Sequence, residues 1–411
     1  MKILIVSTYD KLGGASVAAL RLHKALLDIR VDSQMIVQNK ISDDYTILAK
    51  KNKISRGLNK MRPTIDNLPV NFYKNRKQTL FSPSWFPFSG IADLINEVNP
   101  DLVHLHWISG GMLRIEDINK IKAPIVWTLH DCWPFTGGCH ILFDCSKYRK
   151  SCGSCPTLGS NDENDLSKKI FNRKKRVYNA QKKLTIVAVS KWIFEASKSS
   201  TLLKNKRHVI IPNPIDINIF KPLRKDIARD LWNLPNGKKL ILFGAYNAIN
   251  DLNKGFQELS NALKNLKSTE VELVVFGSSQ PETQTNFEFQ THFLGHLHDE
   301  ISLAALYSAV DVMVVPSHQE AFGQTASESL ACGTPVVAFG SSGLLDIVDH
   351  KINGYLAEPF KSIDLAFGID WVLNNPLYDE LRLNARKKVL RDFDSKKIAS
   401  KFFTLYNDII G

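Results

Sequence analysis

The chain has 411 residues and a formal net charge of +12, and it is 44% hydrophobic and 23% charged. These values are typical of a globular protein and exclude a largely disordered chain, and the length indicates two or three domains. No apolar run reaches the roughly 18 residues that a bilayer crossing requires. The apolar run at residues 1–7 is too short for the core of a signal peptide, so we expect a cytoplasmic protein.

Much of the basic excess lies in two clusters in the first half of the chain. Such clusters attract the phosphates of nucleic acid, anionic lipid or a diphosphate-linked substrate, and a solvated basic face with no partner is the alternative. The clusters are Lys50, Lys51, Lys53, Arg56, Lys60 and Arg62, and then Arg173, Lys174, Lys175 and Arg176.

Short apolar runs alternate with longer segments through the first half of the chain. After the first run, apolar residues recur at helical spacing from Val17 to Leu26. This alternation predicts a parallel α/β sheet with helices between its strands. The expected strands are 2–7, 33–37, 103–106, 125–129 and 184–189.

A second series of the same kind begins near residue 207. Its expected strands are 209–211, 240–243, 271–276, 290–294, 310–315 and 336–339, with helices at 256–266 and 301–309. We therefore expect two doubly wound, Rossmann-like domains, residues 1–206 and 207–394. An amphipathic helix at 395–411 follows, and packing of this helix on the first domain is one arrangement open to it. Ligands of such sheets bind beyond the carboxyl ends of the strands, so two facing sheets predict a cleft.

The most informative segment is 316–337, which reads PSHQEAFGQTASESLACGTPVV. It predicts a turn at Ala321–Gln324 that opens a helix, and a strand lies on either side of this unit. A helix N-terminus offers unpaired N–H groups to an anion, whereas the carboxylates of Glu320 and Glu328 suit hydroxyl groups. Phosphate and hydroxyl recognition side by side predicts a nucleotide-sugar site.

Three further positions follow expected strands and are candidates for the same site. Gly13–Gly14 opens a helix, where phosphate binding competes with the interpretation as a plain turn. His130 is placed to exchange a proton or hold a sugar hydroxyl, or else is an ordinary loop histidine. Lys254 is placed to bind a diphosphate, or is an ordinary surface lysine. The alternation of His104 and His106 puts both on one face of a strand, as possible lining of the site.

Five of the six cysteines fall in an insertion at 132–155, directly after His130. Cys152-Gly-Ser-Cys155 has the spacing of a zinc knuckle, and Cys139 and Cys145 complete a set of four thiolates, with His140 as a substitute ligand. Structural zinc, free thiols or a redox pair, and disulfides all remain open. Cys332 is expected to be a small buried residue.

The segment Phe72–Phe88 combines aromatic side chains with basic ones. This composition favours contact with a membrane surface or with a lipid-linked acceptor, and packing against the sheet is the alternative.

Taken together, these motifs resemble the retaining glycosyltransferases of family 4, over nearly the whole chain. The signature of that family is P-S-x-x-E-x-F-G with a second glutamate eight residues after the first, and residues 316–328 match it. Residues 211–216 resemble a P-N-G-V-D segment, with proline in place of glycine. HDCWPFTGGCH at 130–140 is similar to the colanic-acid-type (WcaC-like) subgroup, which makes exopolysaccharides.

The resemblance implies the GT-B fold, two Rossmann-like domains facing across a cleft. It also implies site roles: Gly13, Gly14 and Lys254 would bind the donor diphosphate, and Glu328 the ribose. Glu320 and the amides around Phe322, Gly323 and Gln324 would hold the donor sugar, with His130 near the reacting centre. One departure is Ala245, where the family usually has an arginine.

The expected reaction transfers a hexose, with retention, from a nucleoside diphosphate sugar to a glycan or polyprenyl-diphosphate-linked acceptor, in exopolysaccharide, capsule or O-antigen synthesis. No D-x-D motif in suitable context is present, so we expect no catalytic divalent ion. We also expect no nucleic acid partner, and a location in the cytoplasm, free or at the inner face of the membrane. Two alternatives remain: a basic, zinc-containing nucleic-acid-binding protein, and a catalytically silent GT-B partner subunit.

Overall fold

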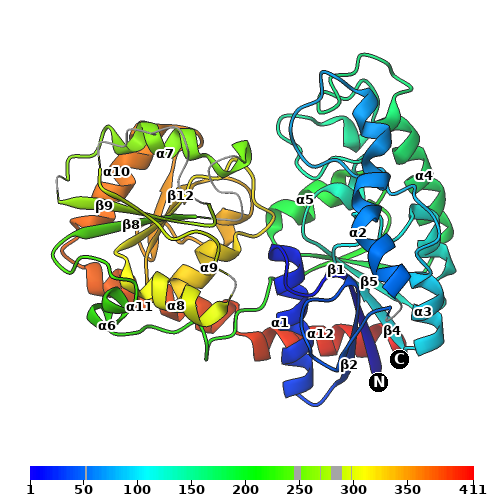
Figure 1. Ribbon diagram of the computed structural model, residues 1–411, viewed down its shortest axis with the longest axis horizontal. Helices are drawn as coiled ribbons and strands as arrows, with labels where there is room; N and C mark the ends of the chain where they lie inside the picture. The colour runs from blue at the N-terminus through cyan, green and yellow to red at the C-terminus, as the bar shows by residue number, and fades with distance from the viewer. Residues whose placement is uncertain (51–52, 245–250, 269, 279–288, 298) are drawn as a thin grey trace. The chain divides into compact units, whose positions relative to one another are not determined.

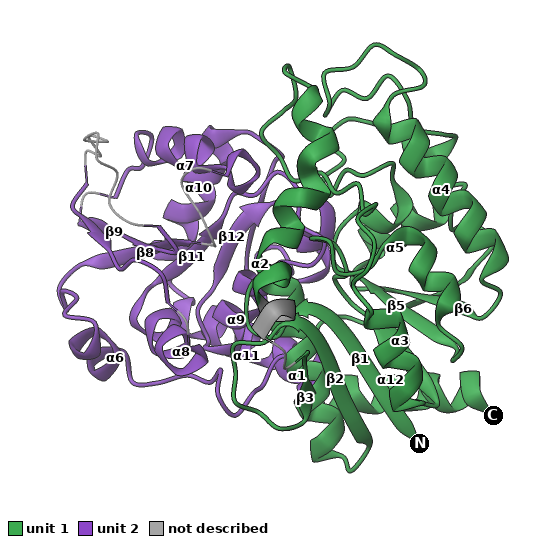
Figure 2. Cartoon of the chain, turned by 45° about the vertical axis from the view of Figure 1, so that its right-hand side comes forward, with its two compact units in different colours: residues 1–213, 396–411 green, residues 214–395 purple. Residues whose placement is uncertain are grey.

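The computed structural model describes residues 1–50, 53–244, 251–268, 270–278, 289–297 and 299–411. The chain divides into two compact units, shown in different colours in Figure 2. Unit 1 comprises Met1–Asn213 and Lys396–Gly411, and unit 2 comprises Pro214–Ser395. Each unit is an α/β domain with its own parallel sheet (Figure 1), so the predicted fold class is confirmed.

Unit 1 has a seven-stranded sheet in the order β3-β2-β1-β4-β5-β6-β7. All of its strand pairs are parallel. Its strands are β1 (Lys2–Tyr9), β2 (Asp32–Asn39), β3 (Ile47–Leu48), β4 (Leu102–Leu105), β5 (Ile125–Leu129), β6 (Leu184–Ala188) and β7 (Arg207–Ile210). The runs in β4, β5 and β6 are buried along their whole length, as expected for strands covered by helices on both faces.

The helices of unit 1 are α1 (Gly14–Asp28), α2 (Lys53–Asn67), α3 (Ile91–Val98), α4 (Leu166–Ala180), α5 (Lys191–Ser199) and α12 (Ser395–Ile410). Asp165 and Ser190 accept backbone N–H groups at the starts of α4 and α5, which fixes where these helices begin. The apolar face of α12 joins the core of unit 1 through Ile398, Phe402 and Tyr406. The end of the chain therefore packs with its beginning, as Figure 1 shows.

Unit 2 has a six-stranded parallel sheet in the order β10-β9-β8-β11-β12-β13. Its strands are β8 (Lys239–Gly244), β9 (Val271–Phe276), β10 (Thr291–Phe293), β11 (Val312–Val315), β12 (Val336–Phe339) and β13 (Gly354–Ala357). Its helices are α6 (Lys225–Leu231), α7 (Phe256–Leu263), α8 (Glu300–Ala309), α9 (Gln324–Ala331), α10 (Ser362–Leu373) and α11 (Tyr378–Asp392).

One strand assignment from the sequence is corrected. The run at 209–211 was expected to begin the second sheet, but β7 pairs with β6 and is the last strand of the first sheet. Accordingly, unit 1 extends to Asn213, whereas the expected first domain ended at residue 206. In the part of the chain that the structure describes, no helix is long and apolar enough to cross a membrane.

Candidate functional site

The strand order reverses at one point in each sheet, and the candidate residues follow the strands at these points. In unit 1 the reversal lies between β1 and β4, and Gly13 follows β1. In unit 2 it lies between β8 and β11; Lys254 follows β8, and Glu320 follows β11. Loops diverge at such a reversal and leave a crevice beyond the strand ends, which is where doubly wound folds bind ligands.

In unit 2, the predicted turn before a helix is present. Gly323 precedes α9 with a φ of 106°, and α9 begins at Gln324. Phe322 is buried and packs edge-on against Phe393, with ring centroids 5.2 Å apart. No side chain caps the helix, so its first N–H groups are available to an anion or to a sugar oxygen. The side-chain nitrogen Nε2 of Gln324 is buried and has no hydrogen-bond partner.

Lys254 and Glu320 form an ion pair beside this helix start. Lys254 Nζ lies 2.7 Å from Glu320 Oε1, and the two side chains are 22% and 19% exposed. Burial acts to lower the pKa of Lys254, but the charge of Glu320 and its hydrogen bond outweigh this effect and raise the pKa. The lysine is therefore a permanent cation at neutral pH, and it holds one carboxylate oxygen of Glu320.

Asn253 joins the loop that carries Lys254 to the segment that carries Glu320. Its side chain donates to Gln319 O at 2.8 Å and accepts from Gln319 N at 3.1 Å, and its carbonyl accepts from His318 N at 2.8 Å. The two segments can lie this close because residue 255 is glycine. A Cβ at this position would lie 1.9 Å from Pro316 O, and the φ of Gly255 is 70°. The contact therefore requires glycine at this position.

Glu328 lies one turn into α9 and is 5% exposed. The hydroxyl of the fully buried Tyr307, from α8, donates to Glu328 Oε2 at 2.9 Å. This hydrogen bond offsets part of the free-energy cost of burying the carboxylate and fixes the orientation of the carboxylate.

In unit 1, Gly13 precedes α1 with a φ of 84°, and no side chain caps the helix. A Cβ at Gly13 would meet no atom within 4 Å, so the space above this turn is open. The 15-residue helix presents its positive end there, as phosphate binding requires.

His130 follows β5 and belongs to a set of three histidines. His106 Nδ1 and His130 Nε2 are 2.8 Å apart, and their rings stack with centroids 5.0 Å apart. His104 lies between Tyr406 OH and Thr128 Oγ1, each at 2.7 Å. Burial lowers the pKa of His130 to about 4 and that of His104 to about 3. All three rings are therefore neutral at pH 7, and one of His106 and His130 donates its N–H to the other.

The next residue, Asp131, organises the loop after His130. Its carboxylate accepts from Trp107 Nε1 at 2.8 Å, from His140 Nδ1 at 2.6 Å and from the Trp133 amide at 2.9 Å. Burial acts to raise the pKa of Asp131, but the attraction and hydrogen bond of His140 outweigh it and lower the pKa. His140 is thus engaged with a carboxylate and with Ser82 Oγ rather than with the cysteines.

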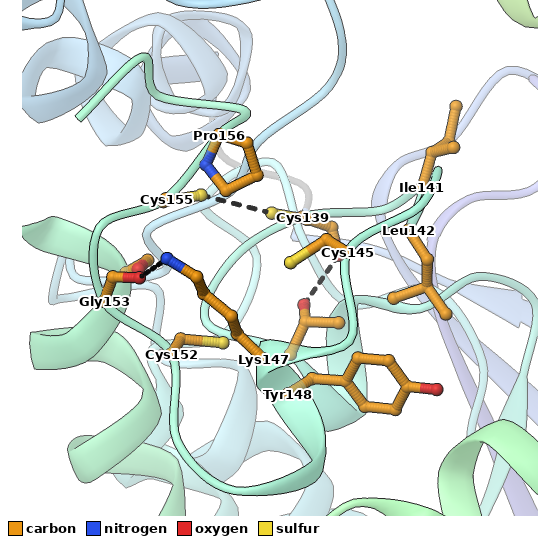
Figure 3. Close-up of a pocket in the computed structure, with 12 residues that line it drawn as sticks. Cys139, Ile141, Leu142, Cys145, Lys147, Tyr148, Cys152, Gly153, Cys155 and Pro156 are labelled. Atoms are coloured by element: carbon orange, nitrogen blue, oxygen red, sulfur yellow. Dashed lines mark hydrogen bonds between the residues drawn. The ribbon is translucent and has the colours of Figure 1, made fainter. Parts of the chain in front are cut away.

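The cysteine set lies in the same loop. Cys139, Cys145, Cys152 and Cys155 all line one cavity of about 20 Å³ (Figure 3). Cys139 Sγ and Cys155 Sγ are 3.8 Å apart, and no disulfide joins any of the six cysteines. A thiol hydrogen bond between these two lowers the pKa of Cys155 and raises that of Cys139, and burial raises the pKa of Cys152 to about 12. Cys332 is buried, as the sequence predicts.

Two family models match the chain, and together they span most of it. The model described as "Glycosyltransferase Family 4" matches residues 12–219, half of the chain, and the model described as "Glycosyl transferases group 1" matches residues 225–389. The chain belongs to glycosyltransferase family 4. It is therefore a glycosyltransferase of the type that uses nucleotide sugars. The predicted family is confirmed; the colanic-acid-type subgroup and the retention of anomeric configuration stay predictions.

This family 4 glycosyltransferase is similar in sequence to curated glycosyltransferases of other organisms. An uncharacterised glycosyltransferase of Methanocaldococcus jannaschii is 27% identical over 74% of this chain and 82% of its own length. The N,N'-diacetylbacillosaminyl-diphospho-undecaprenol alpha-1,3-N-acetylgalactosaminyltransferase of Campylobacter jejuni is 26% identical over 57% of this chain and 64% of its own.

Solved structures support the GT-B fold. Sucrose-phosphate synthase of Thermosynechococcus elongatus has a TM-score of 0.70 at 20% identity, covering 100% of this chain and 99% of its own. Anabaena HepE, solved with UDP and glucose, has a TM-score of 0.66 at 18% identity, covering 99% and 100%. These similarities concern the fold.

Several contacts around the candidate site were not identified from the sequence. Tyr307, which orients Glu328, and Asn253, which anchors the Lys254 loop, had no motif to mark them. Ser342 accepts the Glu320 amide at 2.9 Å and has a φ of 50°, unusual for a residue other than glycine. The position of Ser342 after the predicted strand at β12, next to Gly343, was the sequence feature that could have identified it as a turn residue near the site. The predicted departure at Ala245 lies outside the described residues.

The basic clusters are less open than the sequence suggests. Arg62 is buried and donates to the carbonyl groups of Gly111, Phe86 and Pro87. Lys174 is fully buried, and Arg173 pairs with Glu116. These cations hold the fold of unit 1 and are not free to bind external phosphate.

Proposed function

We propose that this family 4 enzyme transfers a hexose from a nucleoside diphosphate sugar to a hydroxyl group of a growing glycan, with retention of anomeric configuration. The observation that carries the proposal is the group at the strand-order reversal of unit 2. There, one cation, one carboxylate and an uncapped helix N-terminus lie together, which is the set that recognises a diphosphate and sugar hydroxyls side by side.

Negative charge grows on the leaving diphosphate as the sugar departs. Lys254 is proposed to take up this charge, together with amides around Gly323 and those at the Gly13–Gly14 turn. This requires the donor to draw Lys254 away from its ion pair with Glu320. The freed oxygens of Glu320 then accept hydroxyl groups of the donor sugar, and Gln324 Nε2 supplies a donor that is unpaired in the structure.

Glu328 is proposed to accept from the ribose hydroxyl groups, with Tyr307 holding its carboxylate in a fixed orientation. His130 is proposed to contact the donor sugar near the reacting carbon. Because burial keeps its ring neutral, His130 offers one donor or one acceptor and no positive charge. His106 sets which of the two it offers through their shared hydrogen bond.

We further propose that no divalent ion takes part in the chemistry, because Lys254 and the helix N-termini supply the positive potential that a metal provides elsewhere. Transfer activity that survives thorough chelation supports this view. A strict requirement for added Mg²⁺ or Mn²⁺ contradicts it.

The acceptor is proposed to be a glycan or a polyprenyl-diphosphate-linked glycan in exopolysaccharide, capsule or O-antigen synthesis, reached at the inner face of a membrane. The names of the relatives support this, since the Campylobacter jejuni enzyme acts on a diphospho-undecaprenol-linked substrate. In unit 1, Phe72 and Phe88 are 87% and 91% exposed, with Lys74 and Lys77 exposed nearby. By contrast, Phe81 of the same segment is buried, so the predicted aromatic surface is only partly available.

A thermal-shift screen over nucleoside diphosphates and their sugars tests the donor proposal. A donor present at about one hundred times its Kd adds about 2.7 kcal/mol, which raises the unfolding temperature by several degrees. The donor identified in this way then enters a transfer assay in which NMR of the product assigns the anomeric configuration. Donor binding without hydrolysis or transfer to any glycan acceptor favours the silent partner subunit instead.

A further inference from the structure

The loop between β5 and α4, residues 130–165, is long and contains only two short 3-10 turns, Trp133–Phe135 and Lys147–Arg149. Loops beyond roughly 15 residues are uncommon in compact domains unless something holds them or they are functional. The four cysteines at 139, 145, 152 and 155 are spread along this loop and line the same cavity. They are therefore placed to hold the loop from within.

The separation of two of these sulfurs excludes a disulfide between them in this structure. Cys139 Sγ and Cys155 Sγ are 3.8 Å apart, whereas a disulfide requires about 2.05 Å. Zinc–thiolate bonds are about 2.3 Å long, so two sulfurs on one tetrahedral zinc ion lie about 3.8 Å apart. The observed distance suits two ligands on a shared ion, and in this structure a thiol hydrogen bond spans it.

The space beside this pair has the size that one ion needs. The cavity of about 20 Å³ has room for one water-sized particle. In Figure 3, the side chain of Cys145 lies next to that of Cys139, and Cys152 lies farther along the lining of the same pocket. No group of three or more His, Cys, Asp or Glu among the described residues is already placed to hold a metal. The side chains of Cys145 and Cys152 must therefore move inward to complete four-fold ligation.

A buried lysine lies against the cluster, and burial holds its pKa well below the ordinary value. Lys174, from α4, is fully buried, and its ammonium donates to the carbonyl groups of Trp133 and Thr136. The charges of Cys152, Asp131 and Cys139 act against this lowering. Four thiolates around Zn²⁺ leave a net charge of about −2, which would offset the cost of burying this lysine.

We propose that Cys139, Cys145, Cys152 and Cys155 bind one structural zinc ion that fixes the 130–165 loop, with Lys174 as the charge-compensating neighbour. The ion is held by four protein ligands, so no position is open to substrate, and the site serves the fold rather than the transfer reaction. Because this loop begins at His130, the zinc site indirectly supports a residue of the proposed donor site.

Metal analysis of the full-length protein, purified with neither added metal nor chelator, tests the proposal. We expect about one zinc per chain, released when a mercurial reagent modifies the thiols. Cys152→Ser and Cys155→Ser should each lower the zinc content at least about tenfold. Cys332→Ser, which alters a buried cysteine of unit 2, is the matched control and should keep the metal. Zinc content that is unchanged in the two cluster variants would overturn the proposal.

A measurement on the unmodified chain does not depend on whether the variants fold. After reduction and removal of metal, added Co²⁺ should produce the visible absorption of a tetrahedral tetrathiolate site. A reduced protein with six free thiols that takes up neither Co²⁺ nor Zn²⁺ contradicts the site, as does a native mass that lacks one pair of hydrogens and so reports a disulfide. Neither readout uses sugar transfer, so failure here leaves the proposed donor chemistry intact.

Discussion

Replacing Lys254 by alanine separates a structural ion pair from a catalytic cation. At 2.7 Å, two unit charges attract by about 1.5 kcal/mol in bulk water and about 6 kcal/mol at an effective dielectric constant near 20, before desolvation is subtracted. Both side chains keep about a fifth of their surface exposed. Exposed pairs contribute about 0.2–1 kcal/mol and breaking a fully buried pair costs about 3–5 kcal/mol, so for this mostly buried pair we expect Lys254→Ala to lower the free energy of unfolding by about 1–2 kcal/mol.

The expected effect on transfer is much larger. Removing one group that stabilises charge in a transition state typically costs about 2.7–4 kcal/mol, which is about 100- to 1000-fold in rate. The assay measures kcat and KM for the donor found by thermal shift, alongside urea unfolding of the same sample. Lys264→Ala, which changes an exposed lysine just after α7, is the matched control and should alter neither quantity.

The reasoning is refuted if Lys254→Ala loses stability but keeps kcat/KM within about threefold of the unmodified enzyme, because the ion pair is then structural only. The variant Glu320→Gln provides the complementary measurement. It keeps the shape of the side chain and removes its charge, so it should weaken sugar binding while Lys254 remains available to the diphosphate.

Three further outcomes are expected. Gly255→Ala should destabilise the protein by more than about 2 kcal/mol in urea unfolding, because its Cβ would overlap Pro316 O, whereas Gly237→Ala, at an open position, should change little. Tyr307→Phe should raise the KM for donor about fivefold with kcat nearly unchanged, since it removes one hydrogen bond from Glu328. His104 has a pKa of about 3 in the folded protein and 6.5 in the unfolded chain, so the unfolded chain binds the extra proton and stability falls as the pH drops below 6.5. Between pH 7 and pH 5, His104 alone should lower the free energy of unfolding by about 2 kcal/mol, and His104→Gln should flatten this pH dependence.

The parts of the site that depend on local sequence could be predicted without the structure. The helix start after Gly323 follows from a strand, a glycine and a helix within about 20 residues, and those signals are consecutive in the chain. The strand at β12 and the buried position of Cys332 follow from apolar character alone. The roles given to Glu320, Glu328 and Lys254 stay predictions.

The remainder depends on contacts between distant segments, which composition does not encode. The four residues of β7 look the same whether they pair in one sheet or the other, and only packing decides that they join β6. Lys174 belongs to a run of four basic residues, yet it is buried because its position in α4 places it against the Trp133 ring, 3.5 Å from the centroid. His104 finds Tyr406 across 302 residues, a pairing that exists only once α12 has packed in unit 1.

The two glycine turns that carry candidate residues differ in a way that bears on function. At Gly255 the missing Cβ is explained by the protein itself, since Pro316 O occupies the space that a side chain would need. At Gly13 the φ of 84° favours glycine, but nothing in the described residues fills the space beside it. A turn that needs a bare backbone and has open space beside it, at the start of an uncapped helix, is suited to a ligand rather than to internal packing. Gly13 is therefore the position in unit 1 where the fold itself best supports the proposed contact with the donor diphosphate.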